Sequence, residues 1–216
     1  MSDPSSAPVP STALDAMTAD RVVCVVRAPQ LPDAQALCHA LAAGGIRTVE
    51  LTFTTPDVLR HLREAADAVA PDVVLGVGTV ISADDARAAI DAGARFLVTP
   101  GLRPAVAAVA TAAGVPVLIG ALTPTEVLQA HEAGASAVKV FPASAFGPSY
   151  LSSLHGPHPG IPLVPSGGVT ADNARDYLDH GAVAVTAGTG VVPPGTVAAG
   201  DWAEITRRAQ EFVARL

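Results

Sequence analysis

The chain has 216 residues, of which 50% are hydrophobic, 4% aromatic and 15% charged. This length and composition are typical of one soluble domain that can bury a sizeable core. Thirteen basic residues against twenty acidic ones give a formal net charge of -7. With no run of basic residues, this charge argues against a nucleic-acid partner and against a basic membrane-binding patch. The first residues lack the charged and apolar regions of a secretory signal, so a cytoplasmic protein is expected.

The predicted elements follow a start that is rich in Pro and Ser. Residues 1–10 are expected to be disordered, and residues 11–20 to form a short helix that opens a single domain spanning 11–216. Short apolar runs rich in β-branched residues then alternate with Ala-rich amphipathic segments. The runs predict eight strands, at residues 22–27, 48–53, 74–79, 96–100, 117–121, 137–142, 163–168 and 184–189.

The helices between these strands carry start and stop signals. Thr55-Pro56 and Thr123-Pro124 each place a hydroxyl at the N-cap and proline at the first helical position, and Glu126 completes a capping box with Thr123. Glycines stand where left-handed C-terminal caps are needed before the next strand. These glycines are Gly44, Gly45, Gly93, Gly114, Gly134 and Gly181.

Strand-helix alternation with short connections predicts an α/β protein with a parallel sheet. Eight repeats in this length favour a (β/α)8 TIM barrel with a short N-terminal helix, and a doubly wound open sheet is the second choice. The uncharged stretch between Arg103 and Glu126 is long enough to suggest a membrane span. Because Gly114 and Pro116 interrupt it, a helix, a glycine stop and a short strand explain it better.

No metal or cofactor is expected. Cys24 and Cys38 fall on apolar faces and have no metal-ligand spacing, so buried free thiols are predicted. No pair of histidines has convincing ligand spacing either, and all six are interpreted as surface or structural residues. They are His39, His61, His131, His155, His158 and His180.

Lys139 is the single lysine of the chain, set in the apolar run of residues 137–142. Strand alternation puts Val138 and Val140 on one face and Lys139 on the other, which in a barrel is the interior. Burial of the ammonium favours the neutral amine that Schiff-base chemistry with a ketone requires. A lysine that extends to the barrel rim, or that pairs structurally with a carboxylate, fits its position equally well.

Glu50 also points inward by alternation, together with Thr48 and Thr52, whereas Val49 and Leu51 face the helices. A buried carboxylate near a lysine is either a structural ion pair or the general base that a lysine mechanism needs.

Glycine turns end the last two predicted strands. Residues 165–169 and 187–190 carry them, and their backbone N–H groups can approach a phosphate where barrel enzymes commonly bind one. Arg27, at the end of the first strand, is a candidate for binding a carboxylate or phosphate, although an exposed rim position is the commoner role. Thr79 ends the third strand and taken alone is more often a cap or turn residue.

These residues resemble the KDPG/KHG aldolases, the family of 2-keto-3-deoxy-6-phosphogluconate and 4-hydroxy-2-oxoglutarate aldolases. The resemblance runs from about residue 21 to residue 192. The motifs that carry it are Val26-Arg27-Ala28, Val49-Glu50-Leu51-Thr52-Phe53-Thr54, Gly78-Thr79-Val80, Thr99-Pro100-Gly101, Lys139-Val140-Phe141-Pro142-Ala143, Pro165-Ser166-Gly167-Gly168-Val169 and Ala187-Gly188-Thr189.

The resemblance implies a class I aldolase and a homotrimer. Lys139 would form a Schiff base with the C2 ketone of a phosphorylated 2-keto-3-deoxy acid, and Glu50, through a water, would take the proton of the C4 hydroxyl. Pyruvate and glyceraldehyde 3-phosphate would result without a metal, since the iminium replaces a Lewis acid. The implied substrate-binding residues are Arg27, Thr54, Thr79, Pro100, Phe141, Ser166, Gly167, Gly168, Gly188 and Thr189.

Among these residues, the resemblance assigns the pyruvyl carboxylate to Thr79, with help from Arg27 and the Pro100 segment. The phosphate falls to Ser166, Gly167 and Gly168, and to Gly188 and Thr189.

Two positions depart from the family pattern. Some relatives carry an arginine where Thr54 stands, which leaves Arg27 as the expected cationic contact, and Ser166 replaces a more usual threonine. The remaining alternatives are an aldolase for 4-hydroxy-2-oxoglutarate or for the 6-phosphogalactonate epimer, and a phosphate-binding barrel without Schiff-base chemistry.

Overall fold

The computed structural model describes residues 13–216, so the disorder expected for residues 1–10 lies outside the described residues. Eight parallel strands pair in the order β7-β6-β5-β4-β3-β2-β1-β8, and an isolated bridge between Leu163 and Ala182 joins the two ends. This is the predicted (β/α)8 barrel. The strands are β1 Val22–Val26, β2 Thr48–Thr52, β3 Val74–Gly78, β4 Leu97–Val98, β5 Val117–Ala121, β6 Ala137–Val140, β7 Leu163–Pro165 and β8 Val185–Ala187.

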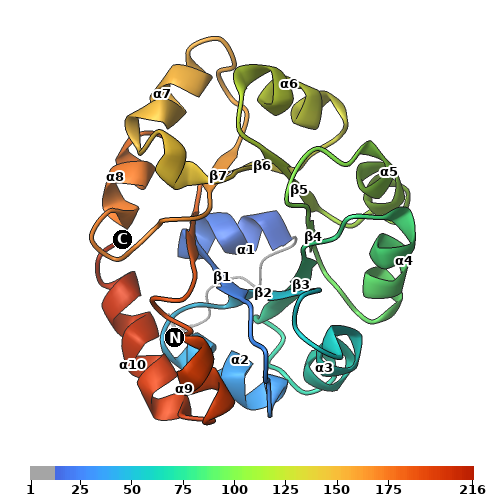
Figure 1. The fold of residues 1–216 in the computed structure, drawn as a ribbon, viewed down its shortest axis with the longest axis vertical. Helices are drawn as coiled ribbons and strands as arrows, with labels where there is room; N and C mark the ends of the chain where they lie inside the picture. The colour runs from blue at the N-terminus through green and yellow to red at the C-terminus, as the bar shows by residue number, and fades with distance from the viewer. Residues whose placement is uncertain (1–12) are drawn as a thin grey trace, which may run out of the picture.

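Helices surround the strands, as the view down the barrel in Figure 1 shows. They are α1 Ala13–Asp20, α2 Ala34–Ala43, α3 Val58–Ala66, α4 Ala83–Asp91, α5 Pro104–Ala112, α6 Pro124–Glu132, the 3-10 turn η1 Ala143–Ala145, α7 Ser149–His155, α8 Ala174–Asp179, α9 Pro194–Ala198 and α10 Trp202–Val213. None of these described helices is long and apolar enough to cross a membrane. The uncharged stretch noted in the sequence forms α5 and β5 instead.

Strand alternation divides the core into two clusters. Outward-facing residues such as Val49 and Val138 pack with the helices. Inward-facing residues such as Phe96 and Leu118 fill the barrel and contact Met17 of α1. Because the side-chain period of a strand is two residues, strands such as β1 and β5 contribute to both clusters, whereas the inward residues of β2 are polar.

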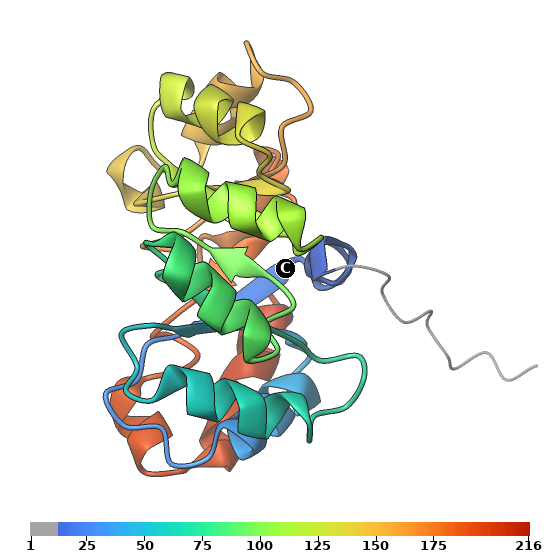
Figure 2. The same ribbon diagram turned by 90° about the vertical axis from the view of Figure 1, so that its right-hand side faces the viewer.

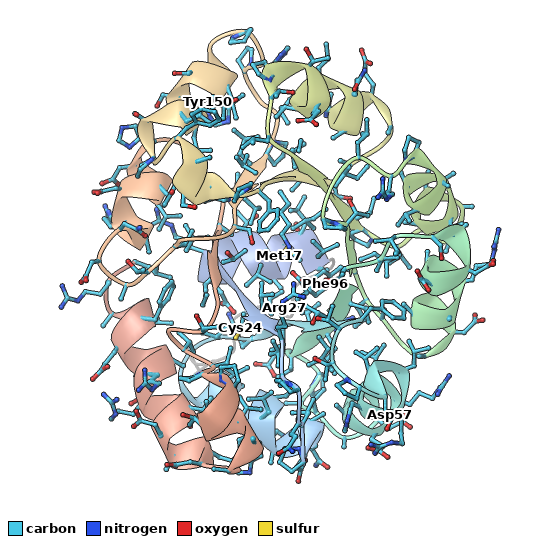
Figure 3. All side chains as sticks on the ribbon, viewed as in Figure 1. Met17, Cys24, Arg27, Asp57, Phe96 and Tyr150 are labelled. Carbon is cyan, nitrogen blue, oxygen red and sulfur yellow. The ribbon has the colours of Figure 1, made fainter. Side chains whose placement is uncertain are left out.

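Helix α1 closes the end of the barrel where the strands begin. It lies at one end of the barrel in Figure 2, and Met17 falls within the ring of strands in Figure 3. Asp20, at the end of α1, accepts hydrogen bonds from the backbone N–H and the guanidinium of Arg47, which directly precedes β2. With this end covered, the open end of the barrel is the one where the strands end.

The predicted left-handed helix stops are confirmed at five of the six glycines, and the prediction is wrong for Gly44. Gly45, Gly93, Gly114, Gly134 and Gly181 all have φ between +66° and +101°, the left-handed region that glycine adopts without strain. Gly44, in contrast, keeps a right-handed conformation, and a Cβ there would overlap Ala209 of α10. The Gly44-Gly45 pair therefore both ends α2 and lets α10 pack closely against it.

One predicted helix start is confirmed and one is wrong. Thr123 and Glu126 form the capping box, with Pro124 at the first position of α6. Helix α3, however, begins at Val58, two residues after the expected start. The Thr55 hydroxyl does not cap it, because it accepts the backbone N–H of Ala28 at 3.2 Å.

Candidate active site

A cavity of about 530 Å³ opens where the strands end. The lining includes every predicted substrate-binding residue except Thr54, and it also includes Lys139. These residues are Arg27, Thr79, Pro100, Lys139, Phe141, Ser166, Gly167, Gly168, Gly188 and Thr189. Val169 and Gly190 also line the cavity, as members of the two predicted glycine turns. Five further lining residues were not predicted, namely Val25, Thr170, Thr186, Val192 and Pro194.

Lys139 faces the cavity as strand alternation predicts. Val138 and Val140 lie in the outer core, whereas Lys139 points inward and is 8% exposed. Its Nζ lies 3.7 Å from Glu50 Oε1 and 5.8 Å from the centre of the Phe141 ring. A separation of 3.7 Å pairs the charges but is too long for a hydrogen bond. The amine therefore stays available to an electrophile in the cavity.

Glu50 lies beside Lys139 in the barrel interior and is 1% exposed. Its Oε1 is fully buried and has no hydrogen-bond partner among the described residues. Buried carboxylate oxygens are normally satisfied. An unsatisfied carboxylate oxygen beside Lys139 is therefore an exception that a role in the chemistry of the site would explain.

Gly78, at the end of β3, provides the space that the Glu50 carboxylate occupies. A Cβ at position 78 would overlap Oε1 and the carboxyl carbon of Glu50. Thr79 follows with φ +60°, a strained conformation for a residue with a branched side chain. The end of β3 thus shapes the site in two ways. Gly78 leaves room for the Glu50 carboxylate, and Thr79 lines the cavity.

We expect Gly78→Ala to slow any reaction that depends on Glu50 by about 10²-fold, because the added methyl group displaces the carboxylate from its position. Steady-state kinetics measures the rate, and circular dichroism checks that the variant is folded. The matched control is Gly156→Ala, at the end of α7, where the nearest atom would lie at 3.5 Å. An unchanged rate in Gly78→Ala would show that the carboxylate does not have to occupy this position.

Arg27 lies at the cavity rim and is held by Thr54. One guanidinium nitrogen of Arg27 donates to Thr54 Oγ1 at 2.7 Å, and Thr54 Oγ1 lies 2.8 Å from the hydroxyl of Thr52. Figure 3 shows Arg27 near β1 within the ring of strands. Thr54 therefore does not line the cavity, and its hydroxyl orients the cation that does.

The turn after β7 exposes backbone N–H groups and is fastened from outside. Gly167 and Gly168 have φ of +84° and +81°. The Asn173 side chain accepts the N–H of Thr170 at 2.8 Å and donates to the carbonyl of Gly168 at 3.0 Å. Successive backbone N–H groups in a turn are the kind of surface that binds an anion. Asn173 was not predicted, although an Asn three residues after a Thr is a known local capping pattern.

Pro100 reaches the cavity mouth because its turn crosses directly over β5. The Thr99 hydroxyl donates to the Gly101 carbonyl at 2.7 Å and accepts the Gly120 N–H at 3.0 Å. A Cβ at Gly120 would overlap the backbone of this turn. Glycine at this position of β5 is therefore what lets the turn lie so close.

The cysteines take no part in the site. Both are free and buried, as predicted. Burial raises the pKa of the Cys24 thiol well above its ordinary value and that of Cys38 to about 12, so both remain protonated. Among residues 13–216, no group of three or more His, Cys, Asp or Glu side chains is arranged to hold a metal ion.

Comparison with known proteins gives a consistent result. Residues 14–208 match the family model described as KDPG and KHG aldolase. The 2-dehydro-3-deoxy-phosphogluconate aldolase of Treponema pallidum is 38% identical over 207 residues, which cover 93% of this chain and 95% of that protein. The KHG/KDPG aldolase of Escherichia coli K12 is 33% identical over 198 residues, which cover 91% and 92%.

A solved structure agrees in fold and size. The KDPG aldolase of Legionella pneumophila, with pyruvate captured at low pH as a covalent carbinolamine intermediate, aligns with a TM-score of 0.85 at 29% identity. The alignment covers 93% of this chain and 97% of that one.

Proposed function

This chain belongs to the KDPG and KHG aldolase family, and on that premise we propose that it cleaves 2-keto-3-deoxy-6-phosphogluconate (KDPG) to pyruvate and glyceraldehyde 3-phosphate. The reaction makes it a carbon-carbon lyase of the class I type. The observation that carries the proposal is the approach of Lys139 Nζ to Glu50 Oε1, 3.7 Å apart beneath the cavity. A nucleophilic amine and an unsatisfied carboxylate oxygen at one point are what Schiff-base cleavage needs.

The first chemical step belongs to Lys139. Its neutral amine attacks C2 of the substrate ketone to give a carbinolamine, which loses water to form a protonated Schiff base. The iminium carbon then accepts electrons more readily than the ketone carbon would.

The second step belongs to Glu50. Its carboxylate removes the proton of the C4 hydroxyl, through a water, and the C3–C4 bond breaks. The bonding electrons move into the iminium to leave an enamine on Lys139, while C4 departs as the aldehyde carbon. Protonated Glu50 returns a proton to C3, and hydrolysis then releases pyruvate and the free amine.

The two charged ends of the substrate are assigned to different parts of the cavity lining. Arg27 at the rim, with Thr79, offers charge and a hydroxyl to the carboxylate next to C2. The turns after β7 and β8 offer backbone N–H groups to the distal phosphate. The Phe141 ring, which lines the cavity 5.8 Å from Lys139 Nζ, offers an apolar surface beside the reacting atoms.

The chemistry of this site also suits closely related substrates. The E. coli relative is named for both KHG and KDPG, and 4-hydroxy-2-oxoglutarate carries a carboxylate where KDPG carries the phosphate arm. The two glycine turns favour the phosphorylated acid, because they offer several N–H donors to one terminal anion. A homotrimer, which the family resemblance implies, and a cytoplasmic location are proposed together with this function.

Trapping with borohydride tests the mechanism directly. The protein is incubated with pyruvate and borohydride, its intact mass is measured, and the adduct is located by peptide mapping. We expect one reduced pyruvate adduct on Lys139, the single lysine of the chain. A panel of KDPG, its galactonate epimer and 4-hydroxy-2-oxoglutarate then ranks the substrates. Absence of a mass shift would favour a phosphate-binding barrel with other chemistry.

A further inference from the structure

We propose that Thr186 is a positioning residue for the phosphate group of the substrate: its hydroxyl ties β8 to β7 and so sets the separation of the two turns that hold the phosphate. The inference rests on the proposed function and names the determinant of its phosphate subsite. Thr186 lines the cavity and is 6% exposed.

The seam between β7 and β8 differs from the other strand pairs. Each consecutive pair from β1 to β7, and the pair β1–β8, forms a parallel ladder. Between β7 and β8 the described backbone pairing is the bridge of Leu163, the first residue of β7, with Ala182, three residues before β8. The Val183 N–H is bonded to the Leu163 carbonyl at 3.0 Å. The seam is therefore pinned by backbone bonds at the end far from the cavity.

Pro165 explains the weakness of the seam at the cavity end. Proline has no backbone N–H, so position 165 cannot donate a ladder hydrogen bond to β8. The Thr186 hydroxyl donates to the Pro165 carbonyl instead, at 3.1 Å and within the buried interior. The Thr186 side chain thus links the two strands at the end near the cavity, where Pro165 has no N–H that could bond β8.

The position of this bond couples it to the phosphate subsite. Ser166 follows Pro165 directly in the chain, and Gly188 lies two residues after Thr186. Both turns begin immediately beyond the bonded pair. The β7 turn is already fastened on its outer side by Asn173. The Thr186 bond is then what fixes the β7 turn relative to the β8 turn.

Thr48 offers a matched contrast inside the same barrel. It lies on β2, is fully buried, and its hydroxyl has no hydrogen-bond partner among the described residues. Thr48→Val removes a hydroxyl from the barrel interior without breaking a bond. Thr186→Val removes a hydroxyl of the same kind together with the link across the seam.

The test compares a phosphorylated ligand with an unphosphorylated one. KM and kcat for KDPG are measured beside the half-saturating pyruvate concentration in borohydride trapping. We expect Thr186→Val to raise KM for KDPG about fivefold, the equivalent of one hydrogen bond, with kcat and the pyruvate value unchanged. Thr186→Ser, which keeps the hydroxyl, should behave as the wild type, and so should Thr48→Val.

Several outcomes would overturn the assignment. These are an unchanged KM in Thr186→Val, an equal rise for KDPG and pyruvate, or a Thr186→Ser variant as impaired as Thr186→Val. If Thr186→Val does not fold, Thr186→Ala and Thr186→Ser form the deciding pair, since alanine removes the hydroxyl and adds no bulk. Failure of the wild-type protein to form any pyruvate adduct would instead contradict the proposed function itself.

Discussion

Lys139→Met should abolish the cleavage of KDPG, with kcat/KM at least about 10⁴-fold below that of the wild type. The loss follows because the C2 ketone can form its Schiff base only on a free amine, and methionine fills the same space without one. The chain has no other lysine. Intact-mass measurement after pyruvate and borohydride treatment should therefore show no adduct on a side chain, and a coupled assay should show no pyruvate release.

Lys139→Arg separates the charge of the lysine from its chemistry. Arginine keeps a cation beside Glu50, but its guanidinium stays protonated and forms no Schiff base. Both variants should be inactive, and the methionine variant should be the less stable, because it leaves the buried Glu50 carboxylate without a counter-charge. Activity in either variant, or a retained adduct in Lys139→Met, would contradict the role of Lys139.

Patterns with short periods made most of this fold predictable from the sequence. All eight strands lie within the predicted runs, because apolar β-branched segments between glycine stops are locally specific signals. Alternation also predicted that Lys139 and Glu50 face the interior. Their meeting across the barrel, from β6 and β2, follows from closure of the sheet, so a local pattern and the fold class together were sufficient.

Contacts between residues distant in the chain explain what the sequence did not predict. The Thr55-Pro56 signal resembled that of Thr123-Pro124, but the Thr55 hydroxyl bonds the backbone of Ala28, 27 residues earlier, and α3 begins later. A capping signal is local, whereas the competing partner becomes visible only when β1 and β2 lie side by side. The same reasoning applies to Thr54, whose partner Arg27 is equally distant in the chain.

The inward position of Thr186 follows from the same strand alternation, although it was not predicted. Strand alternation that turns Val185 and Ala187 toward the outer core turns Thr186 inward, as it does Lys139. A polar residue on the inner face of a barrel strand close to its end is therefore a candidate for the site, whatever its chemical reactivity. Its partner, the Pro165 carbonyl, depends on how β7 and β8 meet and could not be read from the pattern.

Glu50→Gln should slow KDPG cleavage by about 10²- to 10⁴-fold, the usual contribution of a general base. Glutamine matches the shape of glutamate and fits the space that Gly78 leaves, so the fold should persist while the basic oxygen is lost. Glu126→Gln is the matched control on α6, where glutamine can still complete the capping box, and its rate should not change.

Pyruvate alone separates the two roles that Glu50 could have. Adduct formation needs the amine of Lys139 to reach C2, whereas exchange of the pyruvate methyl protons with D₂O also needs a base at C3, the step that cleavage uses in reverse. If Glu50 is the base, Glu50→Gln should lose methyl exchange, measured by NMR, about as strongly as it loses cleavage, and trapping with borohydride should fall much less. If Glu50 only pairs with the charge of Lys139, exchange, cleavage and trapping should fall together, because all three then depend on the same disturbed amine.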